Sequence, residues 1–393
     1  MTRYPAPAGC RKLWLGAGPA AKVLRCEAME HGSTSMPELL KTLHEQGGSD
    51  LHLKVGRSPM MRLRGDLVPI AASAVLGIDD VERLIHGVTN DDQRAKLDAE
   101  RELDFSFAIP GVARFRGNAF FQMGTPAAAF RLIPAKVPTL EELGLPEVLK
   151  DLSLKKQGLF LVTGPTGSGK TTTLAAIIDH INSHVPAHIV TLEDPIEFVY
   201  EDRMALINQR EIGSDTHDFA QGLRRALRQD PDVILVGELR DAETITTALS
   251  AAETGHLVFG TLHTNDAKQS IDRVLDTYAS DAQHQIRMQL AKCLLAVVSQ
   301  RLVKRADGLG RVAVQEIMIN TPLVQKLIED DKINGLGKAI EDSVSFHRMQ
   351  SLNQALLQHV KAKTVTAEEA LAASRNPNDL KIQLQTQGRL GAV

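Results

Sequence analysis

The chain has 393 residues, of which 43% are hydrophobic and 24% charged, and its formal net charge is −3. This length suits two or three domains. The small negative charge excludes an overall positive field that would attract nucleic acid or an anionic membrane. Three scattered cysteines exclude a four-cysteine zinc site, and no stretch approaches the ~18 consecutive apolar residues of a membrane helix, so we expect a cytoplasmic protein.

Residues 1–35 differ in composition from the rest of the chain. They are rich in alanine, glycine and proline and lack a helical period. Their longest apolar stretch is too short and too broken for a signal peptide. We expect a disordered extension, or sequence upstream of a true start at Met29 or Met36.

Residues 36–133 read as a small α+β domain. A helix is expected from Met36, because three leucines recur at helical spacing before a Gly-Gly pair. Alternating apolar and polar residues then predict strands within 49–56, 60–70, 103–110 and 113–122, with a helix near 78–88. Residues 134–155 carry three prolines and are expected to form a linker.

Residues 156–305 follow a different pattern. Near-continuous apolar runs at 158–164, 188–194, 232–238 and 256–263 are separated by helical stretches. Strands buried on both faces have this composition, so we expect an α/β domain with a parallel sheet. Residues 306–393 are expected to form a helical region, with amphipathic stretches at 321–332, 349–363 and 366–374.

A glycine-rich stretch between the first apolar run and the following helix has the pattern of a phosphate-binding loop, "GPTGSGKT". Its glycines let successive backbone N–H groups point at phosphate oxygens, next to the positive end of a helix. Lys170 is expected to reach the β- and γ-phosphates of ATP, and the Thr171 hydroxyl to hold Mg²⁺. The residues expected to bind nucleotide here are Gly164, Pro165, Thr166, Gly167, Ser168, Gly169, Lys170, Thr171 and Thr172.

Polar side chains follow three other strands of the expected sheet. Glu193 and Asp194 end one strand, Glu238 follows another behind Gly237, and His263 ends a third. Parallel strands present their carboxyl ends at one edge of the sheet, where ligands bind. Glu238 is therefore expected to polarise an attacking water, directly or through Mg²⁺.

With these motifs the sequence resembles the secretion ATPases of type II and type IV pilus systems, and within them the pilus retraction motors. The resemblance covers nearly everything from Met36 onward and includes "TLEDPIEF", "DPDVILVGELRD" and "AAETGHLVFGTLHTND". It implies a hexameric ATPase with a PAS-like N-terminal domain and a RecA-like P-loop core. It also implies that Glu238 is catalytic, that Glu193 supports the water or the metal, and that His263 and His256 form a histidine box at the nucleotide.

Arginines outside the phosphate loop are expected to stabilise the transferring γ-phosphoryl group. Arg210 matches a family arginine that reaches a nucleotide across a subunit boundary, and Arg228 is the second choice. By the same resemblance, arginines of the N-terminal domain approach the phosphates from the other domain: Arg114, Arg116 and Arg131. Gly117 stands where an apolar residue is expected.

Two features bear on the choice within the family. The chain lacks the tetracysteine motif and the further N-terminal domain of the assembly and secretion members, which favours retraction. Residues 323–327, "LVQKL", depart from the signature of the principal retraction motors, which leaves an accessory motor as an alternative, beside a pilus-assembly or type II secretion ATPase. As a simple amphipathic helix, the same segment would pack its leucines on the core. The expected partners are identical subunits, an inner-membrane pilus platform protein and a second retraction ATPase, but no nucleic acid.

Overall fold

A computed structural model describes residues 35–71, 73–133 and 136–386. They divide into two compact units, one of residues up to Leu103 with Ala119–Ala129, and one of Asp104–Asn118 with the residues from Phe130 onward. The expectation for residues 1–35 lies outside the described residues, except at Ser35. The two sheets of the molecule are described separately.

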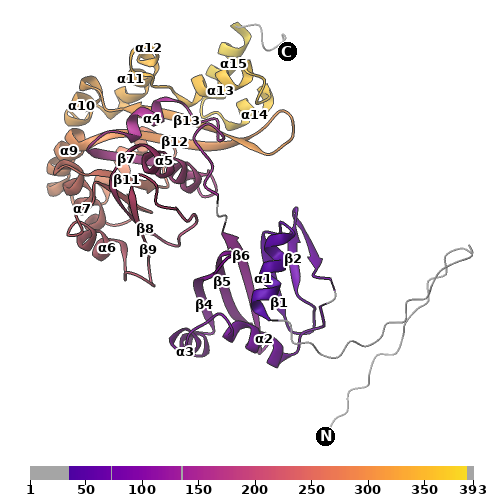
Figure 1. Cartoon of the computed structure of the whole chain (residues 1–393). Coiled ribbons are helices and arrows are strands. Elements are labelled where there is room, and N and C mark those ends of the chain that lie inside the picture. The colour runs from indigo at the N-terminus through magenta and orange to yellow at the C-terminus, as the bar shows by residue number, and fades with distance from the viewer. Residues whose placement is uncertain (1–34, 72, 134–135, 387–393) are drawn as a thin grey trace, which may run out of the picture. The chain divides into compact units, whose positions relative to one another are not determined.

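The N-terminal sheet has six strands in the order β3-β2-β1-β6-β5-β4 and is accompanied by three helices (Figure 1). The expected first helix is confirmed: the backbone N–H of Ser35 donates to the Glu38 carboxylate at 2.8 Å, which satisfies a free donor at the helix start. This arrangement confirms the expected α+β architecture. Its elements are α1 (Met36–Glu45), β1 (Asp50–Lys54), β2 (Met60–Leu63), β3 (Asp66–Pro69), α2 (Ile78–His86), α3 (Asp91–Glu100), β4 (Glu102–Ile109), β5 (Ala113–Gln122) and β6 (Thr125–Ile133).

Gly117 makes room for a cluster of phenylalanine rings in this sheet. The ring of Phe105 lies edge-on to that of Phe130, with centroids 6.2 Å apart. A Cβ atom on Gly117 would lie 2.7 and 2.8 Å from ring atoms of Phe105 and 3.0 Å from the ring of Phe130. The missing apolar side chain at position 117 is therefore explained, because the rings occupy its place.

We expect Gly117→Ala to lower the free energy of unfolding by about 1–3 kcal/mol, the usual cost of overpacking a core. The change is measured by urea unfolding. Combined with Phe105→Leu, which vacates the ring position, Gly117→Ala should cost less than it does alone. If the losses in free energy of unfolding of the two single variants simply add in the double variant, Gly117 does not have this packing role.

The second sheet has seven strands in the order β13-β12-β7-β11-β10-β8-β9. The expected parallel core is confirmed, since β12, β7, β11, β10, β8 and β9 pair in parallel, while β13 pairs antiparallel with β12. The elements up to the last parallel strand are α4 (Val148–Ser153), β7 (Gly158–Thr163), α5 (Lys170–His184), β8 (His188–Glu193), β9 (Leu206–Glu211), α6 (Phe219–Ala226), β10 (Val233–Val236), α7 (Ala242–Glu253), β11 (Leu257–Leu262), α8 (Ala267–Asp276), α9 (Ser280–Cys293) and β12 (Leu294–Lys304).

Alternate residues of the central strands enter two different cores, one on each face of the sheet. On β7, Leu159 and Leu161 pack with residues of α7, α8 and α9, whereas Phe160 and Val162 pack with α4 and α5. A strand with a core on each side has no solvent face, so its sequence is apolar without interruption. The result is a rigid platform whose strand ends hold the side chains that follow them.

The hairpin of β12 and β13 was not expected, because residues after 305 were predicted to be helical. β13 (Arg311–Ile319) extends the sheet and packs with the helices that follow it. These helices are α10 (Pro322–Glu329), α11 (Leu336–Asp342), α12 (Val344–His347), α13 (Leu352–Lys361), α14 (Ala367–Ala373) and α15 (Pro377–Thr386), with a short 3₁₀ turn at Ile333–Gly335.

Helix α10 contains the "LVQKL" segment and is amphipathic, as predicted. Val324 and Ile328 are buried and Leu327 packs against the same core, but Leu323 is 57% exposed. The prediction that the leucines pack on the core therefore holds for Leu327 only. Within the described residues, no helix combines the length and the apolar composition needed to cross a membrane.

Candidate active site

Four strand ends meet at one edge of the seven-stranded sheet. Thr163 at the end of β7 lies opposite Leu262 of β11. Val236 at the end of β10 lies opposite Gly260 of β11 and Leu192 of β8. The loops that leave these strands therefore emerge side by side, as the order of the strands requires.

The phosphate loop connects β7 to α5, and its conformation depends on glycine. Gly169 has φ +85°, a left-handed conformation that L side chains rarely adopt, and it directly precedes the first residue of α5. Lys170 is 9% exposed and donates to the carbonyl oxygens of Gly164 at 2.8 Å and Pro165 at 3.2 Å. Burial lowers the pKa of the Lys170 ammonium, and the nearby Glu238 carboxylate partly offsets this effect.

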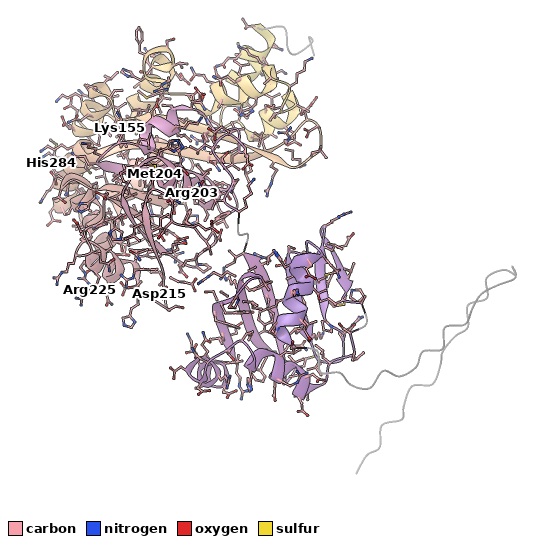
Figure 2. The ribbon with its side chains drawn as sticks, viewed as in Figure 1. Lys155, Arg203, Met204, Asp215, Arg225 and His284 are labelled. Carbon is pink, nitrogen blue, oxygen red and sulfur yellow. The ribbon has the colours of Figure 1, made fainter. Side chains whose placement is uncertain are left out.

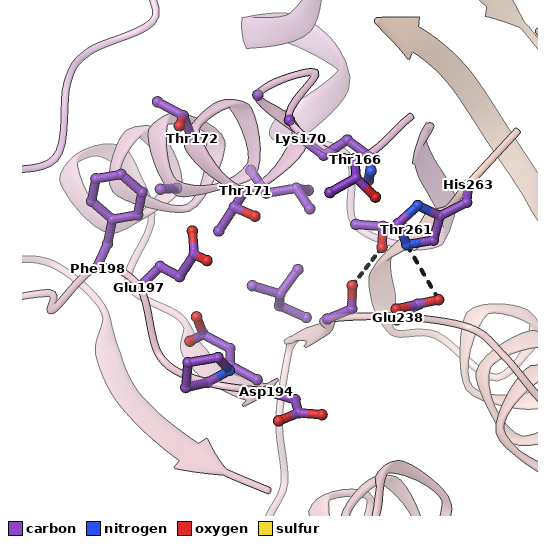
Figure 3. Close-up of a pocket in the computed structure, with 18 of the residues that line it drawn as sticks. Thr166, Lys170, Thr171, Thr172, Asp194, Glu197, Phe198, Glu238, Thr261 and His263 are labelled. Atoms are coloured by element: carbon purple, nitrogen blue, oxygen red, sulfur yellow. Dashed lines mark hydrogen bonds and ion pairs between the residues drawn. The ribbon is translucent and has the colours of Figure 1, made fainter. Parts of the chain in front are cut away.

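A cavity of about 610 Å³ opens beside the loop (Figure 3). Lys170 and Thr171 lie on one side of it, and Glu238 and His263 lie across from them. The cavity is large enough for a nucleotide-sized ligand. Its other lining residues include Thr166, Gly167, Gly169, Thr172, Glu193, Asp194, Glu197, Phe198, Tyr200, Gly237, Arg240, Thr261, Leu302 and Arg311.

Glu238 is held by two cationic or potentially cationic neighbours. Its carboxylate lies 2.6 Å from Nη2 of Arg240 and 3.4 Å from Nε2 of His263. Burial raises the pKa of Glu238, but hydrogen bonds and charge from Arg240 and His263 outweigh burial and leave this pKa below its usual value. The carboxylate is therefore ionised at neutral pH, as a general base must be.

The side chain of Glu193 is more deeply buried than that of Glu238. Its side chain accepts hydrogen bonds from Oγ1 of Thr191 at 2.7 Å and Nε2 of Gln209 at 3.2 Å. Burial raises the pKa of Glu193, and these two hydrogen bonds oppose the shift. The pKa of Glu238 therefore lies below its usual value, and the pKa of Glu193 lies above it.

Gly237, between β10 and Glu238, allows two strands to approach each other closely. Its N–H donates to the carbonyl of Leu192 at 2.8 Å, and its carbonyl accepts from Oγ1 of Thr261 at 2.5 Å. A Cβ atom on Gly237 would lie 3.1 Å from that Leu192 carbonyl oxygen. Gly237 lines the cavity. Because the backbone of β8 lies so close to it, there is little room for a side chain at this position.

The donors at this edge suit a magnesium ion that is shared with a ligand. Thr171 supplies a hydroxyl, and Glu193 and Glu238 supply carboxylates, all oxygen donors of the kind Mg²⁺ prefers. Within the described residues, no group of three or more His, Cys, Asp or Glu side chains forms an all-protein metal site.

The predicted arginines and His256 lie elsewhere. Arg210 is on β9, where it donates to the Asp215 carbonyl at 2.9 Å, and Arg228 follows α6; neither lines the cavity. Arg114 and Arg116 lie on β5 and Arg131 on β6, in the N-terminal sheet. Their roles at a nucleotide remain predictions.

His256 does not line this cavity, and its predicted role at a nucleotide stays a prediction. His256 precedes β11 and Nδ1 contacts the Ala251 carbonyl at 3.0 Å, whereas His263 follows the last residue of the same strand. Six extended residues separate the two histidines by about 20 Å. They therefore lie at opposite edges of the sheet, and only His263 lines the cavity.

Arg311 was missed by the sequence reasoning, because it begins an unpredicted strand. It lines the cavity with Leu302 of the neighbouring strand, on the hairpin of β12 and β13. The structure records no ion pair between Arg311 and any described residue. A basic residue that lines the cavity from 141 positions further along the chain than Lys170 carries no local sequence signal.

Comparison with known proteins agrees with this geometry. A family model described as type II/IV secretion system protein matches residues 115–372. The chain is 49% identical over 342 residues to the type IV pilus retraction ATPase PilT of Pseudomonas aeruginosa, covering 87% of this chain and 98% of that protein. It is 39% identical over 348 residues to the type IV pilus ATPase PilU of the same organism, covering 88% and 91%. A crystal structure of the pilus retraction motor PilT with bound ADP aligns with a TM-score of 0.83 and 43% identity, covering 89% of this chain and 99% of that one.

Proposed function

The chain belongs to the type II/IV secretion system protein family, and from this premise we propose that it is the ATP-hydrolysing motor that retracts type IV pili. One observation carries the proposal: Glu238, Lys170 and Thr171 line a single cavity at the end of four adjacent strands. The relative named as a retraction ATPase supports ATP hydrolysis as the activity. The similar structure with bound ADP supports an adenine nucleotide as the ligand.

Hydrolysis requires in-line attack of water on the γ-phosphorus of ATP, which forms a P–O bond while the bond to the β,γ-bridging oxygen breaks and ADP leaves. Glu238 accepts the proton of that water, and Lys170 exchanges its contacts with the Gly164 and Pro165 carbonyls for phosphate oxygens. His263 stands beside Glu238 and orients its carboxylate. Thr171 and the carboxylates of Glu238 and Glu193 would hold Mg²⁺, which neutralises phosphate charge when bound.

A complete site in this proposal needs a second subunit. Negative charge spreads over the γ-phosphoryl group in the transition state and requires cations beyond Lys170. Arg210 supplies that charge across a subunit boundary within a homohexamer, with Arg228 as the alternative. Arg114 and Arg116 on β5 and Arg131 on β6 are further candidates to supply positive charge to the phosphates.

The motor works at the cytoplasmic face of the inner membrane. There it acts on a pilus platform protein and, in cells that contain one, beside a second retraction ATPase. Pilin subunits leave the base of the pilus as ATP is hydrolysed, which produces twitching motility.

We expect Arg311→Ala to raise the KM for ATP about three- to tenfold while kcat changes less than twofold. The guanidinium lines the cavity away from Glu238 and would contribute binding that is equal in ground and transition states. Steady-state ATPase kinetics measure both constants. Arg305→Ala, which removes a surface arginine paired with Asp307, is the matched control. An unchanged KM in the Arg311 variant would remove Arg311 from the nucleotide site.

The proposed function is tested in a strain whose retraction ATPases have all been deleted and which carries this chain as its only motor. Force-generating retraction, followed on labelled pili, is expected with the wild-type chain and absent with Glu238→Gln. Pili that never form without this chain, and form when it is restored, would instead identify an assembly ATPase.

The "LVQKL" segment favours a second candidate, an accessory motor. In this alternative the chain binds ATP and docks on a principal motor, but contributes little turnover alone. Retraction that appears only when a principal motor is present would support it. The higher identity to PilT than to PilU, 49% against 39%, favours the principal role.

A further inference from the structure

A buried glutamine lies directly against the phosphate loop. Gln300 is on β12 and is 2% exposed. Its neighbour Ser299 lies opposite Thr163, the last residue of β7, in a parallel pair of strands. Gln300 therefore lies beside Gly164, where the phosphate loop begins.

The side-chain amide of Gln300 is fixed by three hydrogen bonds. Its Nε2 donates to the carbonyl of Ser168 at 2.7 Å. Its Oε1 accepts from Oγ1 of Thr173 at 2.8 Å and from Nε2 of Gln315 at 2.7 Å. Reversing the amide would set its oxygen against the carbonyl oxygen of Ser168 and its NH₂ group against that of Gln315, so these two contacts fix the orientation of the amide.

Two glycines of the loop also approach Gln300. A Cβ atom on Gly164 would collide with the backbone carbonyl of Gln300, and one on Gly169 would lie 2.9 Å from its Nε2. The loop thus contacts this residue at its beginning and at its end. Both glycines are required by this contact as well as by their positive φ angles of 146° and 85°.

These contacts surround the lysine that would bind phosphate. Ser168 precedes Lys170 by two positions, Thr173 follows it by three, and both are bound by one side chain on a different strand. We propose that Gln300 is a positioning residue for the nucleotide site: it holds the phosphate loop and the first turn of α5 in the conformation that binds phosphate. The inference rests on the proposed nucleotide site and extends it to a residue that cannot touch the ligand itself.

Gln300→Met tests this proposal, because methionine keeps the length and volume of glutamine but loses its amide. Gln315→Met is the matched control. Gln315 is 1% exposed and belongs to the same network, but its side chain bonds to Gln300 and not to the loop. Gln300→Met leaves three buried polar groups without this partner, and Gln315→Met leaves one, so Gln300→Met is expected to lower the melting temperature more. ADP affinity is therefore compared for folded protein, at a temperature well below both transitions.

Binding of ADP with Mg²⁺ is measured by titration calorimetry, and KM and kcat for ATP by steady-state assay. We expect Gln300→Met to weaken ADP binding and raise KM about tenfold or more, while Gln315→Met stays within about twofold of the wild type. Equal ADP affinities in the two variants, or an unchanged affinity in Gln300→Met, would overturn the proposal.

A second variant and the ADP affinity of the wild type separate failure of the positioning role from failure to fold and from failure of the proposed function. If Gln300→Met does not fold, Thr173→Val replaces it: this variant keeps the shape of the side chain, removes the bond between Gln300 and the first turn of α5, and should also weaken ADP binding. If the wild-type chain itself fails to bind ADP, the proposed function fails. If the wild type binds and Gln300→Met binds equally well, only the positioning role fails.

Discussion

Glu238→Gln is expected to reduce kcat for ATP hydrolysis by about 10²–10⁴-fold, the contribution of a general base to such a reaction. Glutamine preserves the shape of the side chain and can still accept a hydrogen bond from Arg240, which lies 2.6 Å from the carboxylate. It cannot take up the proton of the attacking water. ATP should therefore bind with nearly the wild-type affinity and persist unhydrolysed, which single-turnover kinetics and equilibrium binding will separate.

The control for this prediction is Glu197→Gln. Glu197 supplies another carboxylate to the same cavity but has no place in the proposed chemistry (Figure 3). Its replacement should leave kcat within about threefold of the wild type. Wild-type turnover by Glu238→Gln would exclude Glu238 as the base, and an equal loss in both variants would indicate a general charge effect in the cavity.

Lys170→Gln is expected to lower kcat/KM for ATP by at least about a hundredfold, with a large loss of nucleotide affinity. The ammonium is the cation placed at the loop, and its charge acts on the phosphates in both the ground state and the transition state. The variant should remain folded, because glutamine can still donate to the Gly164 carbonyl that Lys170 contacts at 2.8 Å. Fluorescent nucleotide titration and steady-state kinetics measure the two effects.

Lys155→Gln is the matched control for the loss of one lysine charge. Lys155 is exposed and lies outside the residues that line the cavity (Figure 2). Its replacement should change neither ADP affinity nor turnover. Undiminished nucleotide binding by Lys170→Gln would contradict the assignment of "GPTGSGKT" as the phosphate loop.

Much of the site could be predicted because its chemistry follows local pattern. A phosphate loop needs glycines, a lysine and a hydroxyl at fixed spacing, and all of them lie within one short segment between a strand and a helix. Uninterrupted apolar runs identify buried parallel strands, and parallel strands share a carboxyl edge. These two facts are enough to bring Glu193, Glu238 and His263 towards Lys170 from sequence alone.

The remainder depends on contacts between distant parts of the chain. Gln300 and Ser168 are 132 positions apart, and Gln315 reaches the network from a strand that was expected to be helix. Arg311 was missed for the same reason. His256 shows a different difficulty: two histidines of one motif are only seven positions apart in the sequence, but the six residues between them form an extended strand that places them at its two ends.

The ring cluster at Gly117 has an evolutionary consequence. A side chain at position 117 and the full ring at position 105 crowd each other in this backbone, since a Cβ atom at 117 would lie 2.7 Å from a ring atom of Phe105. Among related sequences, a bulkier residue at 117 should therefore be accompanied by a smaller one at 105. Either change alone lowers stability, because a side chain at 117 overpacks the cluster and a smaller residue at 105 leaves a cavity.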